Sequence, residues 1–107
     1  MMTLALTLTA VLASIAHAAS RPAFVTRMEW AVALCETGGN WRHHTRDYQG
    51  AYGFYKGSWD AFRPQRFPSE AYNASPWQQT VVMRRIRARY GWTGWGCVTH
   101  GGYRSHL

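Results

Sequence analysis

The sequence lacks the short motifs that identify several large classes of enzyme. Its 107 residues contain no P-loop, no G-x-G-x-x-G, no H-E-x-x-H and no C-x-x-C. Nucleotide-binding, zinc-protease and thioredoxin-like functions therefore have no motif to support them, and no cofactor is expected. No metal site is expected either, because His43 and His44 have no further ligand at suitable spacing.

Acidic side chains are also scarce. The chain has 5 Asp and Glu against 12 Lys and Arg, which gives a formal net charge of +7. A charge of this sign favours an anionic partner. Charge alone would permit a nucleic acid, but the export signal at the start of the chain argues against one.

The composition describes a small globular domain. At roughly 150 residues per domain, the length allows one domain. Aromatic residues make up 15% of the chain and apolar residues 47%, which excludes a disordered tail and a collagen-like or coiled-coil rod. No internal repeat or low-complexity tract is present.

The first 18 residues have the pattern of a secretory signal peptide. An uncharged apolar run, LALTLTAVLASIA, precedes the small-x-small site Ala16-His17-Ala18. The run is shorter than the roughly 20 residues that a membrane span needs, so no stable membrane anchor is expected after cleavage. No Lys or Arg precedes the run, and a retained anchor or a buried helix is the alternative. Export predicts a secreted, extracellular or wall-associated protein.

Export also decides how the two cysteines are interpreted. In an oxidising compartment, Cys35 and Cys97 are expected to form a disulfide. Such a bridge would tie the first helix to the C-terminal region. The alternative is a pair of buried free thiols.

Two helices are predicted from their capping signals. Thr26 and Glu29 form a T-x-x-E capping box, and the helix that follows should stop at Thr37-Gly38-Gly39. Ser75-Pro76-Trp77-Gln78 predicts a second start, and Gly91 ends that helix. The arginines of the second helix are expected on a solvated face: Arg84, Arg85, Arg87 and Arg89.

The middle of the chain shows no helical period. Between Asn40 and Gly57, the stretch YQGAYGFYKG alternates glycine with aromatic residues, which indicates a small hairpin or tight turns. Ser58 is then expected to cap a short helix from Trp59 to Arg63.

Glu36 is the strongest catalytic candidate. It lies in the last turn of the first predicted helix, next to Cys35 and ahead of two glycines. The negative end of the helix dipole disfavours an anion, and partial burial beside apolar rings acts in the same direction. Both effects would help to keep a carboxylic acid protonated, as a general acid requires. The alternative is a solvated glutamate at a helix end.

The other four carboxylates have weaker claims. Glu29 and Asp60 have the positions of helix-face residues, and Glu70 lies in a loop bounded by prolines. Asp47, like Glu36, flanks the glycine- and aromatic-rich middle. It is therefore the one candidate for a second acidic group.

The segment CETGGNW, residues 35–41, resembles the C-E-[ST]-G-G-N-W signature of the resuscitation-promoting factors, the transglycosylase-like cell-wall domains of actinobacteria. The resemblance continues through SWDAF and the distal Cys97, and it covers about residues 30–98. It implies a mainly helical, lysozyme-like α+β fold with a monomeric catalytic domain at 30–98. Residues 19–29 are then a leader with the start of the first helix, and 99–107 are a C-terminal tail.

The resemblance also implies a function. The family cleaves the peptidoglycan glycan strand between N-acetylmuramic acid and N-acetylglucosamine, within an anionic cell wall, and Glu36 matches its catalytic glutamate. A lytic transglycosylase uses the sugar's own 6-hydroxyl as nucleophile, whereas a muramidase uses water, often with a second carboxylate; Asp47 is the possible second carboxylate. The groove residues expected from family position or proximity are Asn40, Trp41, Thr45, Tyr48, Tyr52 and Trp59. For the aromatic ones, and Trp59 in particular, packing in the core is the alternative.

One departure from the family pattern concerns substrate binding. The family commonly has G-G-L-Q-F where this chain has Gly50-Ala51-Tyr52-Gly53-Phe54, so Gly53 replaces a polar glutamine. The loss of that side chain predicts weaker sugar binding and leaves open a non-catalytic wall-binding module. A bacteriophage lysis protein with the same chemistry is a further alternative.

Overall fold

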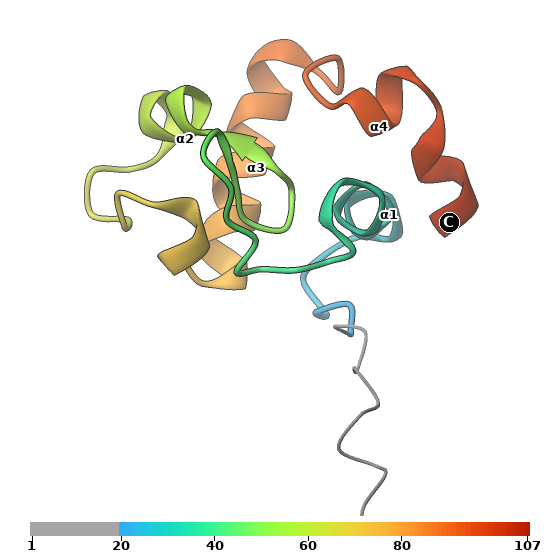
Figure 1. Ribbon diagram of the computed structural model, residues 1–107, viewed down its shortest axis with the longest axis horizontal. Coiled ribbons are helices and arrows are strands. Elements are labelled where there is room, and N and C mark those ends of the chain that lie inside the picture. Colours follow the sequence, from blue (N-terminus) through green and yellow to red (C-terminus); the bar gives the residue numbers. More distant parts are fainter. Residues whose placement is uncertain (1–19) are drawn as a thin grey trace, which may run out of the picture.

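The structure, a computed structural model, describes residues 20–107 (Figure 1). The signal peptide predicted at 1–18 lies outside the described residues. None of the helices in the described part is long and apolar enough to cross a membrane. The elements, in chain order, are α1 (Arg27–Thr37), β1 (Tyr48–Gln49), β2 (Phe54–Tyr55), α2 (Lys56–Phe62), the 3-10 helix η2 (Ala71–Asn73), α3 (Pro76–Tyr90), α4 (Gly96–Thr99) and the 3-10 helix η3 (Gly102–His106).

The capping predictions for α1 are confirmed. Thr26 accepts a hydrogen bond from the backbone of Glu29, and the Glu29 carboxylate accepts one from the backbone of Thr26. The helix ends at Gly38, which has a φ of 72° in the left-handed region that glycine adopts without penalty. These local signals place Glu36 in the last turn of α1.

The predicted start and end of α3 are confirmed as well. Ser75 and Gln78 form both bonds of a capping box, Pro76 occupies the first turn, and Gly91 follows the last residue. The start of α2 is different from the prediction. The helix begins at Lys56 rather than Trp59, because β2 leads directly into it and Tyr55 becomes the residue before its first turn. Ser58 then lies inside the helix and has no capping bond.

The predicted hairpin is present as a two-stranded antiparallel sheet. Tyr48 pairs with Tyr55, and Gln49 pairs with Phe54. The turn between the strands runs through Gly50 and Gly53, which both have positive φ. In Figure 1 this hairpin lies between α2 and α1, with α3 behind it.

A buried glutamine joins the hairpin turn to the rest of the domain. The Gln79 carboxamide accepts the N–H of Ala51 at 2.9 Å and donates to the carbonyls of Trp41, Ala71 and Ala74. Gln79 itself is fully buried in α3. Because buried backbone groups need hydrogen-bond partners, these bonds let one side chain of α3 hold three separate loop segments in place.

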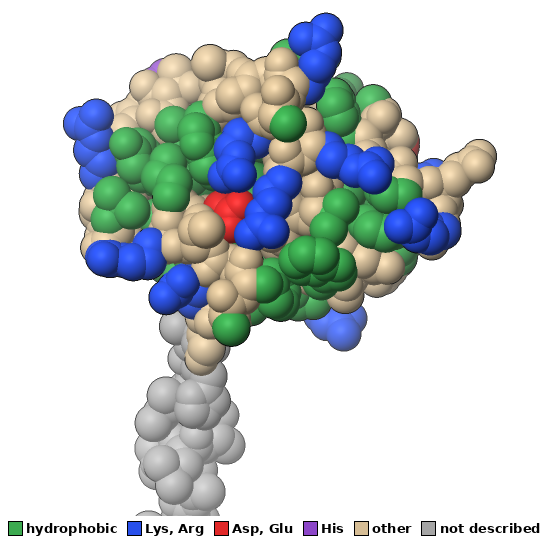
Figure 2. Space-filling view, turned by 180° about the vertical axis from the view of Figure 1, so that it is seen from behind, with side chains coloured by type: hydrophobic (Ala, Val, Ile, Leu, Met, Phe, Trp, Pro, Cys, Tyr) green, Lys and Arg blue, Asp and Glu red, His purple; other side chains and the backbone are tan. Residues whose placement is uncertain are grey.

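A buried ion cluster joins α1 to α3. The Glu29 carboxylate is fully buried and accepts hydrogen bonds from Arg84 at 2.8 and 2.9 Å and from Arg87 at 3.4 Å. Glu29 lies on a face of α1, as predicted, but that face is buried. The prediction that both arginines are only solvated is wrong. The two helices pack so that the charges meet, although they are 55 residues or more apart in the chain. Figure 2 shows basic side chains spread over this face among hydrophobic ones, with acidic atoms visible between two of the basic side chains.

The ion cluster predicts a pH-dependent stability. Burial by itself would raise the pKa of Glu29, but hydrogen bonds from Arg84 and Thr26 and the charge of Arg84 outweigh it, so the pKa lies below its ordinary value of 4.5. The stabilisation that the ionised Glu29 contributes is complete above the ordinary pKa of 4.5. It is lost as the pH falls through the lower pKa of the folded state.

Replacing Glu29 by Gln should lower the free energy of unfolding by about 2 kcal/mol at neutral pH, because two arginines lose their counter-charge. At a pH well below 4.5 the difference should shrink, since the wild-type carboxylate loses its charge as the pH falls through its lowered pKa. Urea unfolding at both pH values measures this. Asp60→Asn is the control, because the Asp60 pair with Lys56 is partly exposed and should change stability by less than about 1 kcal/mol. A loss that is the same at both pH values would contradict the prediction.

The predicted disulfide is confirmed. Cys35 and Cys97 are bonded, with their Cα atoms 6.0 Å apart, and join the end of α1 to α4. The last residues of the chain form η3, which packs against α1. The described residues thus form the small, mainly helical α+β domain with one disulfide that was expected.

Candidate active site

Glu36 lies where α1, the hairpin turn and α4 meet. Its side chain is half-buried, and its Oε1 accepts the N–H of Cys97 at 3.1 Å. The other carboxylate oxygen, Oε2, faces Gly53, where an added Cβ would lie 3.5 Å away. One oxygen is therefore held as an acceptor, and the second is available to carry a proton.

A cavity of about 210 Å³ opens at Glu36, and most of the side chains that line it carry a polar group. Among the predicted groove residues, Thr45 and Tyr48 line it together with Glu36. The remaining lining residues are Thr37, His43 and Gly53. Glu36 is the one carboxylate among these lining residues, and the rest of the wall offers hydroxyl, imidazole and backbone groups suited to hydrogen bonding.

The loop that forms one wall of this cavity is held by its own side chains. The Thr37 hydroxyl donates to the carbonyl of Ala51 at 2.7 Å and accepts the N–H of Asn40 at 3.2 Å. The Thr45 hydroxyl donates to the Tyr48 carbonyl and accepts the Tyr48 N–H, both at 3.1 Å. The loop is thus shaped before any ligand binds, which favours recognition.

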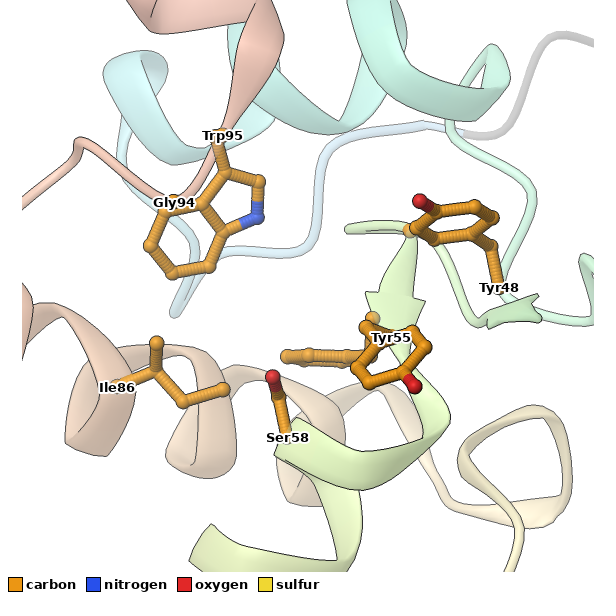
Figure 3. Close-up of a pocket in the computed structure, with 8 residues that line it drawn as sticks. Tyr48, Tyr55, Ser58, Ile86, Gly94 and Trp95 are labelled. Carbon is orange, nitrogen blue, oxygen red and sulfur yellow. The ribbon is translucent and has the colours of Figure 1, made fainter.

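A second, more apolar cavity of about 100 Å³ adjoins the first (Figure 3). Tyr48 and Gly53 line both cavities. Figure 3 shows Trp95 and Ile86 on one side of the space, Tyr48 and Tyr55 on the other, and the Ser58 hydroxyl directed between them. The complete lining is Tyr48, Gly53, Phe54, Tyr55, Ser58, Ile86, Gly94 and Trp95.

Two of the predicted groove aromatics belong to the core. Tyr52 and Trp59 are both 0% exposed. The Tyr52 hydroxyl bonds to that of Thr80 at 2.9 Å, and the Trp59 indole N–H donates to the Pro68 carbonyl at 3.0 Å. Neither ring can therefore be presented to a sugar, and that part of the prediction is wrong. Alternation of glycine with aromatic residues marks a turn but does not say which ring faces inward.

Two other predicted groove residues, Trp41 and Asn40, are neither fully buried nor part of the cavity at Glu36. Trp41 is half-buried and packs against Trp30 and Tyr52, with ring centroids 5.9 and 5.6 Å apart. Asn40 is exposed, and its side chain accepts the N–H of Arg42 at 3.0 Å. Neither residue is among those that line the cavity at Glu36.

Asp47 is not brought to Glu36. Its side chain is 61% exposed, its nearest charged partner is Arg46 at 3.9 Å, and it does not line the cavity. Within residues 20–107, no group of three or more His, Cys, Asp or Glu side chains is arranged to hold a metal ion.

Of the residues that line the apolar cavity, the sequence predicted only Tyr48 as a groove residue. Ile86 and Trp95 were not among the predicted site residues. Both come from segments remote from Glu36 in the chain, so no local pattern connects them to it. The one signal present was the closeness of Trp95 to Cys97, whose partner precedes Glu36.

Comparison with known proteins identifies relatives of this domain. Residues 25–98 match the family described as transglycosylase-like domain. Resuscitation-promoting factor Rpf1 of Corynebacterium glutamicum is 40% identical over 65 residues, which cover 60% of this chain and 34% of that protein. Rpf2 of the same organism is 31% identical over 91 residues, or 76% of this chain and 24% of that protein. RpfA of Mycobacterium tuberculosis is 40% identical over 85 residues, or 78% of this chain and 21% of that protein.

The match spans most of the domain that contains the site. The chain spans about a third or less of the length of these relatives. The matched residues 25–98 include Glu36, both cysteines and the residues that line the two cavities. The chain therefore belongs to the transglycosylase-like domain family, and its relatives include the resuscitation-promoting factors.

Proposed function

We propose that this protein cleaves the glycan strand of peptidoglycan, with Glu36 as the general acid. The observation that carries the proposal is a lone carboxylate at the wall of a polar cavity, with one oxygen held by the Cys97 N–H and the other facing Gly53. Membership of a transglycosylase-like family supports the same chemistry.

The reaction follows from this placement. Glu36 donates a proton from Oε2 to the glycosidic oxygen as the bond to the muramic acid C1 breaks, and positive charge develops on that sugar. The 6-hydroxyl of the same sugar attacks C1 and returns its proton to the Glu36 carboxylate. This closes a 1,6-anhydro ring without the addition of water. No second carboxylate lines the cavity to activate a water, which favours this route over hydrolysis.

Export to the cell wall is part of the proposal. The predicted signal peptide and the disulfide both suit an oxidising compartment outside the cytoplasm. The net charge of +7 favours encounter with a wall polymer that bears carboxylates and phosphates.

Digestion of purified, muramic-acid-containing walls tests the function. The protein should release soluble muropeptides that end in 1,6-anhydromuramic acid when analysed by mass spectrometry. Reducing muramic acid ends would instead identify a muramidase. Binding to the walls without any release of muropeptides would contradict the enzymatic function and identify a wall-binding module.

A further inference from the structure

Gly53 lies at the junction of the two cavities. It lines the polar cavity at Glu36 and the apolar cavity at Trp95, and Tyr48 is the one other residue common to both linings. Gly53 therefore lies between the carboxylate of Glu36 and the apolar cavity.

A side chain at Gly53 would lie directly against the catalytic candidate. A Cβ there would lie 3.5 Å from Glu36 Oε2 and 3.6 Å from Glu36 Cβ. Any longer side chain would cover the carboxylate or project into the junction. The φ of +63° also favours glycine, since other residues adopt it at a penalty.

The apolar cavity has the character of a site for a short acyl group. Phe54, Ile86 and Trp95 supply buried or nearly buried apolar surface, and the Ser58 hydroxyl supplies a hydrogen-bonding group directed into the same space (Figure 3). A volume of about 100 Å³ has room for more than one water-sized group. That is more space than the single methyl group of an acetamide fills.

We propose that Gly53 determines acyl specificity. It opens a passage through which the N-acyl chain of the hexosamine bound at Glu36 enters the apolar cavity, and it admits chains longer than acetyl. The inference rests on the proposed function for the identity of the sugar. It goes further because it assigns the apolar cavity as the site of the acyl chain, and Gly53 as the residue that selects the length of that chain.

The test is calorimetric binding of chitotetraose whose amino groups carry acetyl, propionyl or butyryl. The wild-type protein should bind the propionyl and butyryl forms at least as tightly as the acetyl form. Each methylene group buried in the cavity should strengthen binding by up to about fourfold. Gly53→Ala should bind the acetyl form within about threefold of wild type but the butyryl form at least about tenfold more weakly, because the passage is narrowed.

Two further variants distinguish the effect of a narrowed passage from the effect of backbone strain at residue 53. Gly101→Ala is the matched control, because Gly101 also has a positive φ (79°) but open space around it; its selectivity should equal that of wild type. Gly94 lines the apolar cavity, has no positive φ, and an added Cβ there meets no atom within 4 Å, so Gly94→Leu is expected to fill part of the cavity from another side. It should reproduce the loss of butyryl binding even if Gly53→Ala folds poorly.

The binding measurements test this inference, and wall digestion tests the proposed function separately. Equal selectivity in wild type, Gly53→Ala and Gly94→Leu overturns this inference, and so does exclusion of the longer acyl chains by wild type. Wall digestion by the same preparations reports on the proposed function. Wall digestion together with equal acyl selectivity in all variants overturns the inference alone. Failure of the wild type to bind any of the three oligomers also overturns the inference, and failure to digest walls overturns the proposed function.

Discussion

The Glu36→Gln variant should lose wall-cleaving activity by at least about 100-fold, because glutamine cannot donate the proton that the leaving oxygen needs. The amide oxygen of glutamine can still accept the Cys97 N–H that Glu36 Oε1 accepts at 3.1 Å. The shape of the cavity should therefore be retained, and binding of glycan strands should stay within about threefold of wild type. The rate of release of soluble muropeptides from purified walls is the measurement.

The control for this variant is Asp60→Asn. Asp60 lies in α2 and pairs with Lys56 at 2.9 Å, and it lines neither cavity. Its replacement also removes one negative charge, so it accounts for any effect of net charge on binding to an anionic wall. Full activity of Glu36→Gln would remove Glu36 from the catalytic role, and equal losses in both variants would point to charge rather than acid catalysis.

Replacing both Cys35 and Cys97 by serine should lower the free energy of unfolding by about 4 kcal/mol, from the loop-closure entropy of a bridge of this span. The separation of the two cysteines is 62 residues. Domains of this kind have total stabilities of about 5–15 kcal/mol, so the loss is large. Activity should fall further than the folded fraction, because the backbone of residue 97 is no longer held against Glu36. Urea unfolding and wall digestion on the same samples measure the two effects.

Glu29→Gln is the matched control for the disulfide variant. It should destabilise the domain through the Arg84 and Arg87 cluster while it leaves the Cys97 contact with Glu36 unchanged. Its activity per folded molecule should therefore equal that of wild type. If the disulfide variant also retained full activity per folded molecule, the bridge would have a purely stabilising role.

Features that depend on neighbouring residues were predictable from the sequence. The capping boxes at Thr26 and Ser75 and the glycine stops at Gly38 and Gly91 are confirmed. Each of them satisfies backbone groups within a few residues, so the necessary information is local. The hairpin followed from the spacing of its glycines for the same reason. The disulfide was predictable because there are two cysteines and one way to pair them.

Features that join remote segments needed the tertiary structure. The sequence alone indicates that Glu36 ends a helix. How three segments pack decides that its carboxylate accepts the Cys97 N–H and faces Gly53. The pairing of Glu29 with Arg84, the burial of Tyr52, and the cavity at Trp95 are of the same kind. Backbone hydrogen bonding within a turn is encoded over a few residues, whereas burial and charge pairing are properties of surfaces that exist only after the chain has folded.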